Sequence, residues 1–298
     1  MKHLTILITT ILASFLITHA QKTSDIDFIY IEGGYYIQGK TDSQEGKYLP
    51  SRKVYLDDFY IATKEVPISL YSIFCQEQAW PMPIDIDESK QNHPISNISW
   101  YDAVSFCNWL SQKHNLQACY TIDPNKQDPN NTAWWDDQKW FVQCNFNANG
   151  YRLPTEAEWE YVATLKGTHT NDLPAGVSTL DSLPYYTNFC DTLCQYHSQN
   201  LPLNDGHPTT APIGSLLPNP LGIYDLSGNV WEWCWDWYQE NPAKQKRKNP
   251  TGPKQGGHRV ARGGGWDSPT SILSPHQRIN HSPNSSWGSC GFRLVKSP

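Results

Sequence analysis

The sequence predicts a loop-rich domain in which short strands and a few helices enclose a core of large aromatic residues. Turn-forming residues are dense, with 19 Gly and 22 Pro in 298 residues, and 13 Trp and 16 Tyr supply bulky apolar side chains. Two capping boxes mark helix starts among the loops. With 38% hydrophobic and 17% charged residues, the chain can bury a core.

The first elements are expected to be strands. Residues 28–31 are apolar or aromatic and lead to Gly33-Gly34, after which residues 35–39 continue in the same way. A turn at 57–58 is flanked by apolar residues in alternation, namely Val54, Leu56, Phe59 and Ile61.

Each capping box is expected to begin a helix with one apolar face. In the first box Ser99 stands three residues before Asp102, and the apolar residues that follow at helical spacing are Ala103, Phe106, Cys107 and Leu110. In the second box Thr155 precedes Glu158, and the inner face consists of Trp159, Val162 and Ala163. Gly167 is the expected stop.

A further helix is expected at about residues 69–77. Residues 120–140 and 168–210 show no periodicity and are expected to form long loops.

The first twenty residues have the pattern of a secretory signal peptide. Lys2 gives a weakly positive start, residues 4–17 are apolar or hydroxylic, and Ala20 ends the segment before Gln21. A membrane anchor is the alternative, but the apolar run is short for a bilayer and no lipoprotein cysteine follows it. We therefore expect cleavage after about Ala20 and a soluble, secreted or periplasmic domain of residues 21–298 without a membrane span.

The charge and the cysteines narrow the class of protein further. A formal net charge of -6 argues against a nucleic-acid partner, which requires a basic surface. All 8 cysteines follow the predicted signal peptide, and an even number in an exported protein indicates disulfides. The candidate pairs are Cys190 with Cys194 and Cys119 with Cys144, whereas no pairing can be chosen for Cys75, Cys107, Cys234 and Cys290. Zinc ligation is the alternative, but no second closely spaced pair completes such a site.

Four motifs carry a resemblance to a known family. They are residues 150–161 (GYRLPTEAEWEY), 224–233 (YDLSGNVWEW), 259–266 (RVARGGGW) and 291–293 (GFR). With supporting matches at 33–34, 65–67, 104–110 and 210–214, they resemble the formylglycine-generating enzyme, or sulfatase-modifying factor, family over residues 28–296. The resemblance implies a single α+β domain of the elaborated C-type-lectin-like type, with little regular secondary structure.

The same resemblance implies a chemistry whose central residues are missing here. The aerobic enzymes of the family bind copper(I) with two cysteines and use oxygen to convert a sulfatase cysteine to formylglycine. At the matching positions this sequence has Ser268 and Leu273, and Gly265 stands where the enzymes have a serine. Because copper(I) prefers soft thiolate ligands, neither copper nor a catalytic residue is expected.

Histidines could supply a different metal centre in the same segment. His276 and His281 are five residues apart, which is neither a helical i,i+4 pair nor a common metal-ligand spacing. Both are therefore expected to be loop residues that face solvent.

The resemblance also implies two structural calcium ions, for which hard oxygen ligands are retained. For one ion the matching positions are Asp225, Gly228, Val230 and Glu232, the glycine and valine acting through their carbonyl oxygens. For the other they are Asn188, Phe189, Asp205 and His207, the phenylalanine and histidine acting through their carbonyl oxygens. The alternative is that Asp225 and Glu232 only cap a turn. The neighbouring Trp231, Trp233 and Trp235 are expected in the core.

In the family fold, residues 262–293 line the groove that holds a peptide substrate. The groove residues expected here are Trp266, Asp267, Ser268, Arg278 and Trp287. Short, polar and varied residues on a fixed framework are typical of a binding surface, and plain surface loops are the alternative.

These observations favour an exported, non-catalytic binding or cell-envelope scaffold protein whose ligand is an unknown protein or peptide. The alternative is an oxidoreductase, either formylglycine-generating or another metal-dependent oxygenase, acting on a protein or small molecule in the same groove.

Overall fold

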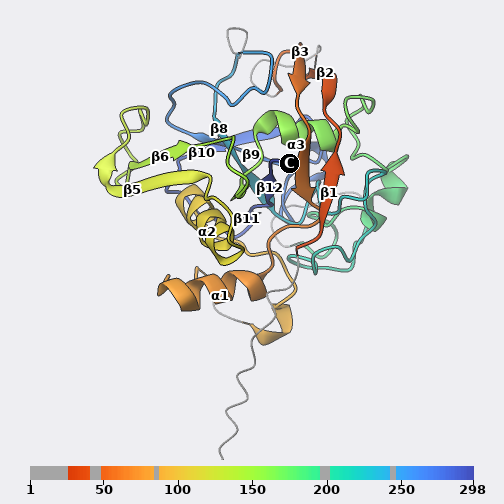
Figure 1. Cartoon of the computed structure of the whole chain (residues 1–298). Coiled ribbons are helices and arrows are strands. Elements are labelled where there is room, and N and C mark those ends of the chain that lie inside the picture. The colour runs from red at the N-terminus through yellow and green to blue at the C-terminus, as the bar shows by residue number, and fades with distance from the viewer. Residues whose placement is uncertain (1–25, 41–47, 84–86, 195–201, 242–245) are drawn as a thin grey trace, which may run out of the picture.

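In the computed structural model, the described residues form two four-stranded sheets and two two-stranded ribbons, which are joined by long loops and packed against three α-helices (Figure 1). The structure describes residues 26–40, 48–83, 87–194, 202–241 and 246–298, so the predicted signal peptide lies outside the described residues. The expected mixture of short strands, helices and long loops is confirmed.

The first sheet joins the beginning and the end of the described chain. Its strands, in the order β1-β4-β12-β7, are Phe28–Ile31, Phe59–Ala62, Val295–Lys296 and Tyr151–Arg152. Val295 lies opposite Ile61, so the last strand completes a sheet that the first strands begin. Both side chains are fully buried against the same apolar cluster as Trp159.

The second sheet carries most of the recognised motifs. Its strands, in the order β10-β9-β8-β11, are Arg278–His281, Arg259–Arg262, Trp231–Trp237 and Cys290–Gly291. β11 pairs with β8 in parallel, whereas β8, β9 and β10 are antiparallel. Trp231 and Trp233 are buried as expected, and Trp235 is partly buried.

The two ribbons project from the body of the molecule (Figure 1). β2 (Gly34–Gln38) pairs with β3 (Arg52–Leu56), and the predicted turn at 57–58 separates β3 from β4. β5 (Tyr120–Gln127) pairs with β6 (Trp140–Cys144). The expectation that residues 120–140 form a loop was therefore wrong for residues 120–127, whereas residues 128–139 do form a loop. Most of β5 faces solvent, so its sequence lacks the alternation that burial of one face imposes.

The helices are α1 (Ile68–Gln78), α2 (Trp100–Lys113) and α3 (Glu156–Ala163), and the 3₁₀ turns are η1 (Glu88–Lys90), η2 (Leu180–Tyr185) and η3 (Thr270–Ile272). Both capping boxes are present, and such a cap typically contributes about 1 kcal/mol. The Ser99 amide donates to Asp102 at 2.7 Å, and the Thr155 amide donates to Glu158 at 2.8 Å. α3 ends before Gly167, the expected stop, and residues 168–210 contain only η2 as regular structure among those described.

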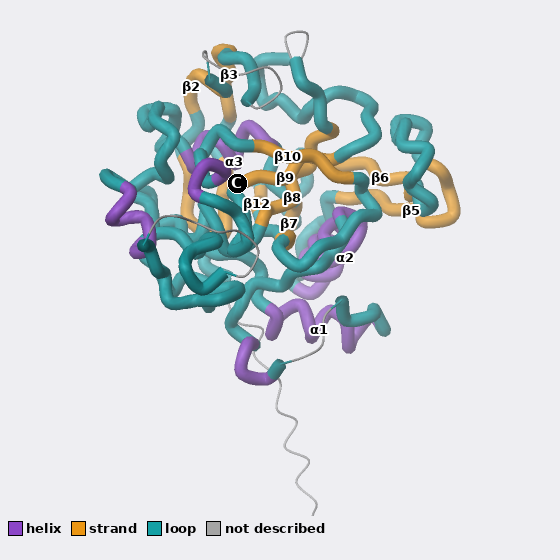
Figure 2. Tube along the Cα trace, turned by 180° about the vertical axis from the view of Figure 1, so that it is seen from behind, coloured by secondary structure: helices purple, strands orange, loops and turns teal. Residues whose placement is uncertain are grey.

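The core consists of aromatic residues on either side of the second sheet. α1 and α2 lie next to each other at one end of the molecule (Figure 2). Between them Tyr71 stacks on Phe106 with ring centroids 5.5 Å apart, and Phe292 meets Phe106 edge-on at 5.3 Å. This packing explains why α2 needs its apolar stripe, since all four predicted stripe residues are fully buried.

Candidate functional site

Buried arginine–glutamate pairs hold the recognised motifs together. All eight residues of α3 are buried, and each of its three glutamates accepts hydrogen bonds from an arginine. The pairs are Glu156 with Arg278, Glu158 with Arg152 and Glu160 with Arg262. A fourth pair, Glu232 with Arg293, joins the second motif to the last. Buried charges are tolerated only when they are paired and hydrogen-bonded, so these motif residues fix the scaffold.

The two positions that match the family's cysteine pair are buried and engaged in packing. The Ser268 hydroxyl accepts a hydrogen bond from the Gly265 amide, and the Ser268 carbonyl accepts one from the Cys190 amide, both at 3.0 Å. Leu273 is 1% exposed. It belongs to a small apolar cluster with Val177, Leu183 and Phe189.

The backbone around these positions is closely packed. A Cβ added to Gly264 would meet Leu273 at 3.0 Å and Ser268 at 3.6 Å, so both side chains lie against this glycine. A Cβ added to Gly265 would lie 2.8 Å from the Cβ of Ser289, which is closer than packed carbon atoms approach. The serine that the enzymes carry at this position therefore cannot be accommodated without a shift of the backbone.

The predicted disulfide between Cys190 and Cys194 is present and lies beside Ser268. Asp191, within the loop that it closes, is 2% exposed and accepts hydrogen bonds from the amides of Leu193 and Asp205, each at 2.7 Å. The disulfide loop thus covers the position of the missing cysteine and also positions Asp205.

The second predicted disulfide is not formed, and Cys119 and Cys144 are both free thiols. The register places Cys144 opposite Tyr120, so Cys119 is offset by one residue. Cys119 lies just before β5, so the two cysteines are not a directly opposed pair of the ribbon. Counting both, six of the eight cysteines are thiols, and the other four are Cys75, Cys107, Cys234 and Cys290.

We expect six cysteines to be alkylated when the unreduced protein is denatured, and Cys190 and Cys194 to react only after reduction. Burial raises the pKa of the Cys107, Cys234 and Cys290 thiols, so the native protein should react slowly. Mass spectrometry of the alkylated peptides gives the count. A count of four, with Cys119 and Cys144 both unlabelled, would restore the pairing of Cys119 with Cys144.

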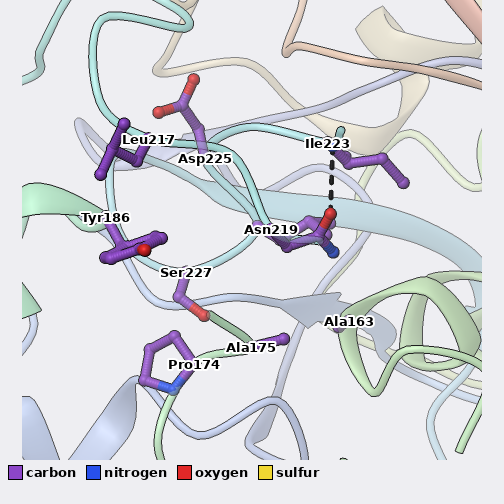
Figure 3. Close-up of a pocket in the computed structure, with 10 residues that line it drawn as sticks. Ala163, Pro174, Ala175, Tyr186, Leu217, Asn219, Ile223, Asp225 and Ser227 are labelled. Atoms are coloured by element: carbon purple, nitrogen blue, oxygen red, sulfur yellow. Dashed lines mark hydrogen bonds between the residues drawn. The ribbon is translucent and has the colours of Figure 1, made fainter. Parts of the chain in front are cut away.

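The first set of predicted calcium ligands lies in one segment, but its two carboxylates have different partners. Asp225 is 4% exposed, accepts the Gly214 amide at 2.7 Å, and lines a small cavity of about 20 Å³ together with Asn219 and Ser227 (Figure 3). Burial raises the pKa of Asp225 to about 6. Glu232 uses one carboxylate oxygen for Arg293 alone and the other for both Arg293 and the Trp159 indole. Hydrogen bonds within the protein therefore already satisfy Glu232.

Gly228 and Val230, which complete the first set, lie between these carboxylates. Gly228 has φ +81°, and its amide donates to the Gly263 carbonyl at 2.9 Å. The Val230 amide donates to Glu65, a fully buried carboxylate that also accepts the Asn229 side chain at 2.8 Å. Burial and the nearby Asp225 and Glu232 raise the pKa of Glu65 well above its usual value. Glu65 was not predicted as a site residue, although it begins the supporting match at residues 65–67.

The second set of predicted ligands is brought next to the first by a bridge between Asn188 and Gly228. Asp205 accepts the amides of Phe189 at 2.8 Å and His207 at 2.9 Å. Burial raises the pKa of Asp205 to about 6 despite these hydrogen bonds. The side-chain oxygen of Asn188 is buried and has no hydrogen-bond partner. The side-chain nitrogen of Asn188 faces Asp205 and donates to both carboxylate oxygens at 3.3 Å. An unpartnered buried oxygen fits a hard cation, so this set suits calcium better than the first.

No cluster of three or more His, Cys, Asp or Glu side chains in the described residues is arranged as a metal site. The calcium sets depend instead on amide and carbonyl oxygens, and calcium binding stays a prediction. Likewise, none of the helices in the described ranges has the length and apolar character that a membrane span requires.

The predicted groove residues separate into two groups. Trp266, Asp267 and Trp287 are half-buried and lie together, because the Trp266 indole donates to the Gly288 carbonyl and Asp267 accepts the Ser289 hydroxyl. Ser268 is buried beneath them.

Arg278 does not belong to this surface. It is 4% exposed and forms two hydrogen bonds with Glu156, at 2.7 and 2.8 Å. The expectation that Arg278 supplies a groove charge was wrong, because its guanidinium is buried and paired with Glu156. The pair could not be foreseen, since the two residues are 122 positions apart in the sequence. His276 was also expected to face solvent, yet it is 5% exposed.

Comparison with known proteins agrees with the motifs. The family model for the sulfatase-modifying factor enzyme 1-like domain matches residues 14–298. A chaperone protein LppX of Paenibacillus barcinonensis is 32% identical over 94% of this chain and 92% of its own length. The formylglycine-generating enzyme of Mus musculus is 30% identical over 72% of this chain, which spans 48% of that enzyme.

Solved structures show the same fold. Treponema denticola variable protein 1 superposes with a TM-score of 0.73 at 28% identity, over 91% of this chain and 95% of that chain. PvdO from Pseudomonas aeruginosa, at 19% identity and a TM-score of 0.67, shares the fold over 91% of this chain and 94% of its own. These likenesses confirm the predicted α+β, C-type-lectin-like class. The chain belongs to the sulfatase-modifying factor enzyme 1-like domain family.

Proposed function

We propose that this protein is an exported, non-catalytic member of its family that binds a protein or peptide ligand. The observation that carries the proposal is the packing at the positions of the missing cysteines. Ser268 is hydrogen-bonded on both its hydroxyl and its carbonyl, Leu273 is part of the core, and Gly265 has no room for a side chain. A copper(I) centre requires thiolates at positions 268 and 273. In this chain Ser268 and Leu273 stabilise the fold instead.

The proposed ligand class rests on the surface next to these residues and on a relative. Trp266, Asp267 and Trp287 present two half-buried indoles and one carboxylate on a scaffold held by buried ion pairs. Aromatic residues on a rigid framework are typical binding anchors. A relative that matches almost the whole chain is named a chaperone protein, which favours a polypeptide ligand. Export is inferred from the signal-peptide pattern of the first twenty residues.

The purified protein is expected to form no aldehyde in a sulfatase-type peptide when copper and oxygen are supplied. The reason is the absence of thiolates at Ser268 and Leu273. Mass spectrometry of the peptide measures the conversion, with a formylglycine-generating enzyme run in parallel as the positive control. Conversion at a comparable rate would favour the oxidoreductase alternative.

Ligand binding is tested by asking whether the protein suppresses the aggregation of a thermally unfolded model protein, followed by light scattering. Asp267→Asn is expected to weaken suppression by roughly tenfold in the concentration required, if a charge-assisted hydrogen bond to the ligand is lost. Asp181→Asn, an exposed carboxylate in the first turn of η2, is the matched control. Equal suppression by both variants would remove Asp267 from the binding surface.

We also propose that the fold binds calcium, held by Asn188, Asp205 and the carbonyls of Phe189 and His207. Chelation is then expected to lower the melting temperature by several degrees, because a ligand that binds only the folded state stabilises it. Asp205→Asn should abolish most of that shift in a thermal melt recorded with and without chelator. An unchanged melting temperature on chelation of the wild-type protein would contradict the proposal.

A further inference from the structure

A pocket of about 310 Å³ shares no residue with the Trp266 surface and is lined by the end of β2, the segment after α3 and the loop before β10. Its lining includes Ile37, Gly39, Lys40, Thr164, His169 and His276. The volume is at the lower end of the range for small-molecule sites. None of the sequence motifs or predicted sites accounts for it.

His276 lines this pocket with an unsatisfied ring. The residue is 5% exposed, and neither ring nitrogen has a hydrogen-bond partner in the described part of the chain. Its Nδ1 is 3.7 Å from a Glu160 oxygen, which is close enough for charge attraction but too long for a hydrogen bond. A buried polar group without a partner is uncommon and points to a group that the ring binds.

Lys40 is held on the same pocket by a chain of contacts that leads to His276. The Lys40 ammonium pairs with Asp172 at 2.5 Å, and Asp172 accepts the Ser274 hydroxyl at 3.1 Å. The same hydroxyl accepts the backbone amide of His276 at 3.3 Å. The Tyr48 ring lies beside both, with its centroid 5.5 Å from the Lys40 ammonium and 6.2 Å from the imidazole.

The imidazole brings two ring nitrogens without a hydrogen bond to this region, and the Glu160 carboxylate lies 3.7 Å from its Nδ1. Asp172 is already paired with Lys40, and Glu160 is paired with Arg262 at 2.5 Å. An ammonium and an imidazole N–H that face one cavity are suited to an oxyanion. Asp172 neutralises Lys40 and Arg262 neutralises Glu160, so these four charges balance, and an anion would be held by hydrogen bonds from the ammonium and the imidazole.

The backbone narrows the class of anion. Phosphate sites are usually built from free backbone N–H groups, but here the Gly39 amide donates to Glu160 and the Lys40 amide donates to the Leu49 carbonyl. Side-chain donors are left, and besides the Thr170 hydroxyl they include the Lys40 ammonium and the His276 ring, which together suffice for the two oxygens of a carboxylate. Ile37 adds an exposed apolar side chain at the rim.

We propose that this pocket binds a small carboxylate, with the His276 imidazole and the Lys40 ammonium donating to its oxygens and Ile37 contacting its apolar tail. This binding site is separate from the surface around Asp267, so it stands or falls independently of the function proposed above.

The test is an NMR titration of the full-length protein labelled at the histidine rings, with acetate, butyrate and phosphate as probes. Butyrate and acetate are expected to shift the His276 ring signal saturably in the millimolar range, with butyrate binding more tightly, while phosphate produces no saturable shift. The signal is assigned by its loss in His276→Gln. A saturable response to phosphate equal to that of the carboxylates would overturn the choice of ligand class.

Lys40→Met keeps the aliphatic length of the side chain and removes its charge, and it is expected to weaken butyrate binding at least tenfold. The matched control is His258→Gln, which alters a half-buried histidine stacked on Trp135 at 5.0 Å, outside the pocket. Wild-type affinity in Lys40→Met, or no saturable shift of His276 with any carboxylate, would refute the proposal. Because the wild-type titration needs no substitution, a variant that fails to fold does not obscure the result.

Discussion

Replacing Glu232 by glutamine is expected to lower the free energy of unfolding by about 3–5 kcal/mol, because it leaves a buried arginine without its counterion. Glu232 and Arg293 are both fully buried. Two hydrogen bonds join them, at 2.5 and 2.6 Å, and the Trp159 indole donates to the same carboxylate at 2.8 Å. Burial disfavours the charge of Arg293, but attraction to Glu232 outweighs it, so the pKa of the guanidinium is raised.

The chain offers a closely matched control for this substitution. Glu77 also accepts a tryptophan indole, that of Trp109 at 2.9 Å, and also pairs with a cation, Lys113. Its side chain is 43% exposed, so water can replace the lost partner. Glu77→Gln is therefore expected to cost less than about 1 kcal/mol, the usual range for a surface pair. Urea denaturation of both variants gives the comparison, and equal losses would show that burial of the Glu232 pair has no special role.

A double variant separates two contributions to the free energy of unfolding. One is the cost of leaving a buried charge unpaired, and the other is the net contribution of the Glu232–Arg293 pair. Glu232→Met with Arg293→Met removes both charges and keeps apolar volume, and it is expected to be more stable than Glu232→Gln alone. The same measurements with and without calcium determine whether Glu232 is a ligand. If Glu232 acts only through Arg293, Glu232→Gln loses the same free energy in both conditions and keeps its sensitivity to chelation.

Local signals in the sequence predicted the helices well. The boxes at Ser99 and Thr155 are built from residues three apart, so the contacts that define them are visible in the sequence itself. The alternation around the turn at 57–58 was likewise local and sufficient. In contrast, β5 went unrecognised because its exposed residues carry no pattern that burial would impose.

Long-range pairs set the limit on predicting the site. The three glutamates of α3 look like the solvent face of a helix, yet their arginines lie 6, 102 and 122 residues away. One signal was available: Glu156, Glu158 and Glu160 alternate around a helix whose other residues are mainly apolar, so no side of it can face water. That pattern requires buried cations, but it does not say that Arg278 is one of them. No comparable local signal marks the burial of His276, which depends on Tyr48 and Glu160 from distant elements.

Replacing Asp236 by asparagine is expected to stabilise the protein at neutral and alkaline pH, and to have little effect near pH 4. Asp236 is 4% exposed, and burial together with the neighbouring Glu156 raises its pKa to about 7. A carboxyl whose pKa is higher in the folded state than in the unfolded chain binds its proton more tightly when folded. Stability is then lost as the pH rises from about 4, where the unfolded aspartate titrates, to about 7.

The size of this effect follows from the shift. Roughly three pH units at about 1.4 kcal/mol each set an upper limit of about 4 kcal/mol, and relaxation around the charge will reduce it. Asparagine keeps an oxygen that can accept the Glu156 amide, which Asp236 accepts at 2.9 Å. It cannot ionise, so the variant should gain over the wild type as the pH rises. Urea denaturation of both proteins at pH 4 and pH 8 measures the difference, and parallel pH profiles would contradict it.

Asp58 provides a control, because its pKa is shifted in the opposite direction to that of Asp236. The Tyr30 hydroxyl and the Gly33 amide donate to it and lower its pKa, so Asp58→Asn should lose stability above pH 4 and not gain it. Asp205 and Asp225 affect stability in the same direction as Asp236, since burial raises the pKa of each to about 6. The lowered pKa values of His93, His258 and His281 act in the opposite direction around pH 6.5, which is why the comparison uses one substitution and not the whole profile.

Calcium is expected to affect Asp205, which is a predicted ligand, and not Asp236, which is not one. A bound cation stabilises the ionised carboxylate, so calcium should remove much of the fall in stability that Asp205 contributes between pH 4 and pH 6. It should leave the difference between Asp236→Asn and the wild type unchanged, because the charged groups that shift Asp236 are Glu156, Glu158 and Arg278 and not a predicted calcium ligand. If calcium changes the stability difference between Asp236→Asn and the wild type, the ion acts on the ion pairs of α3 and not on the ligand set that contains Asn188 and Asp205.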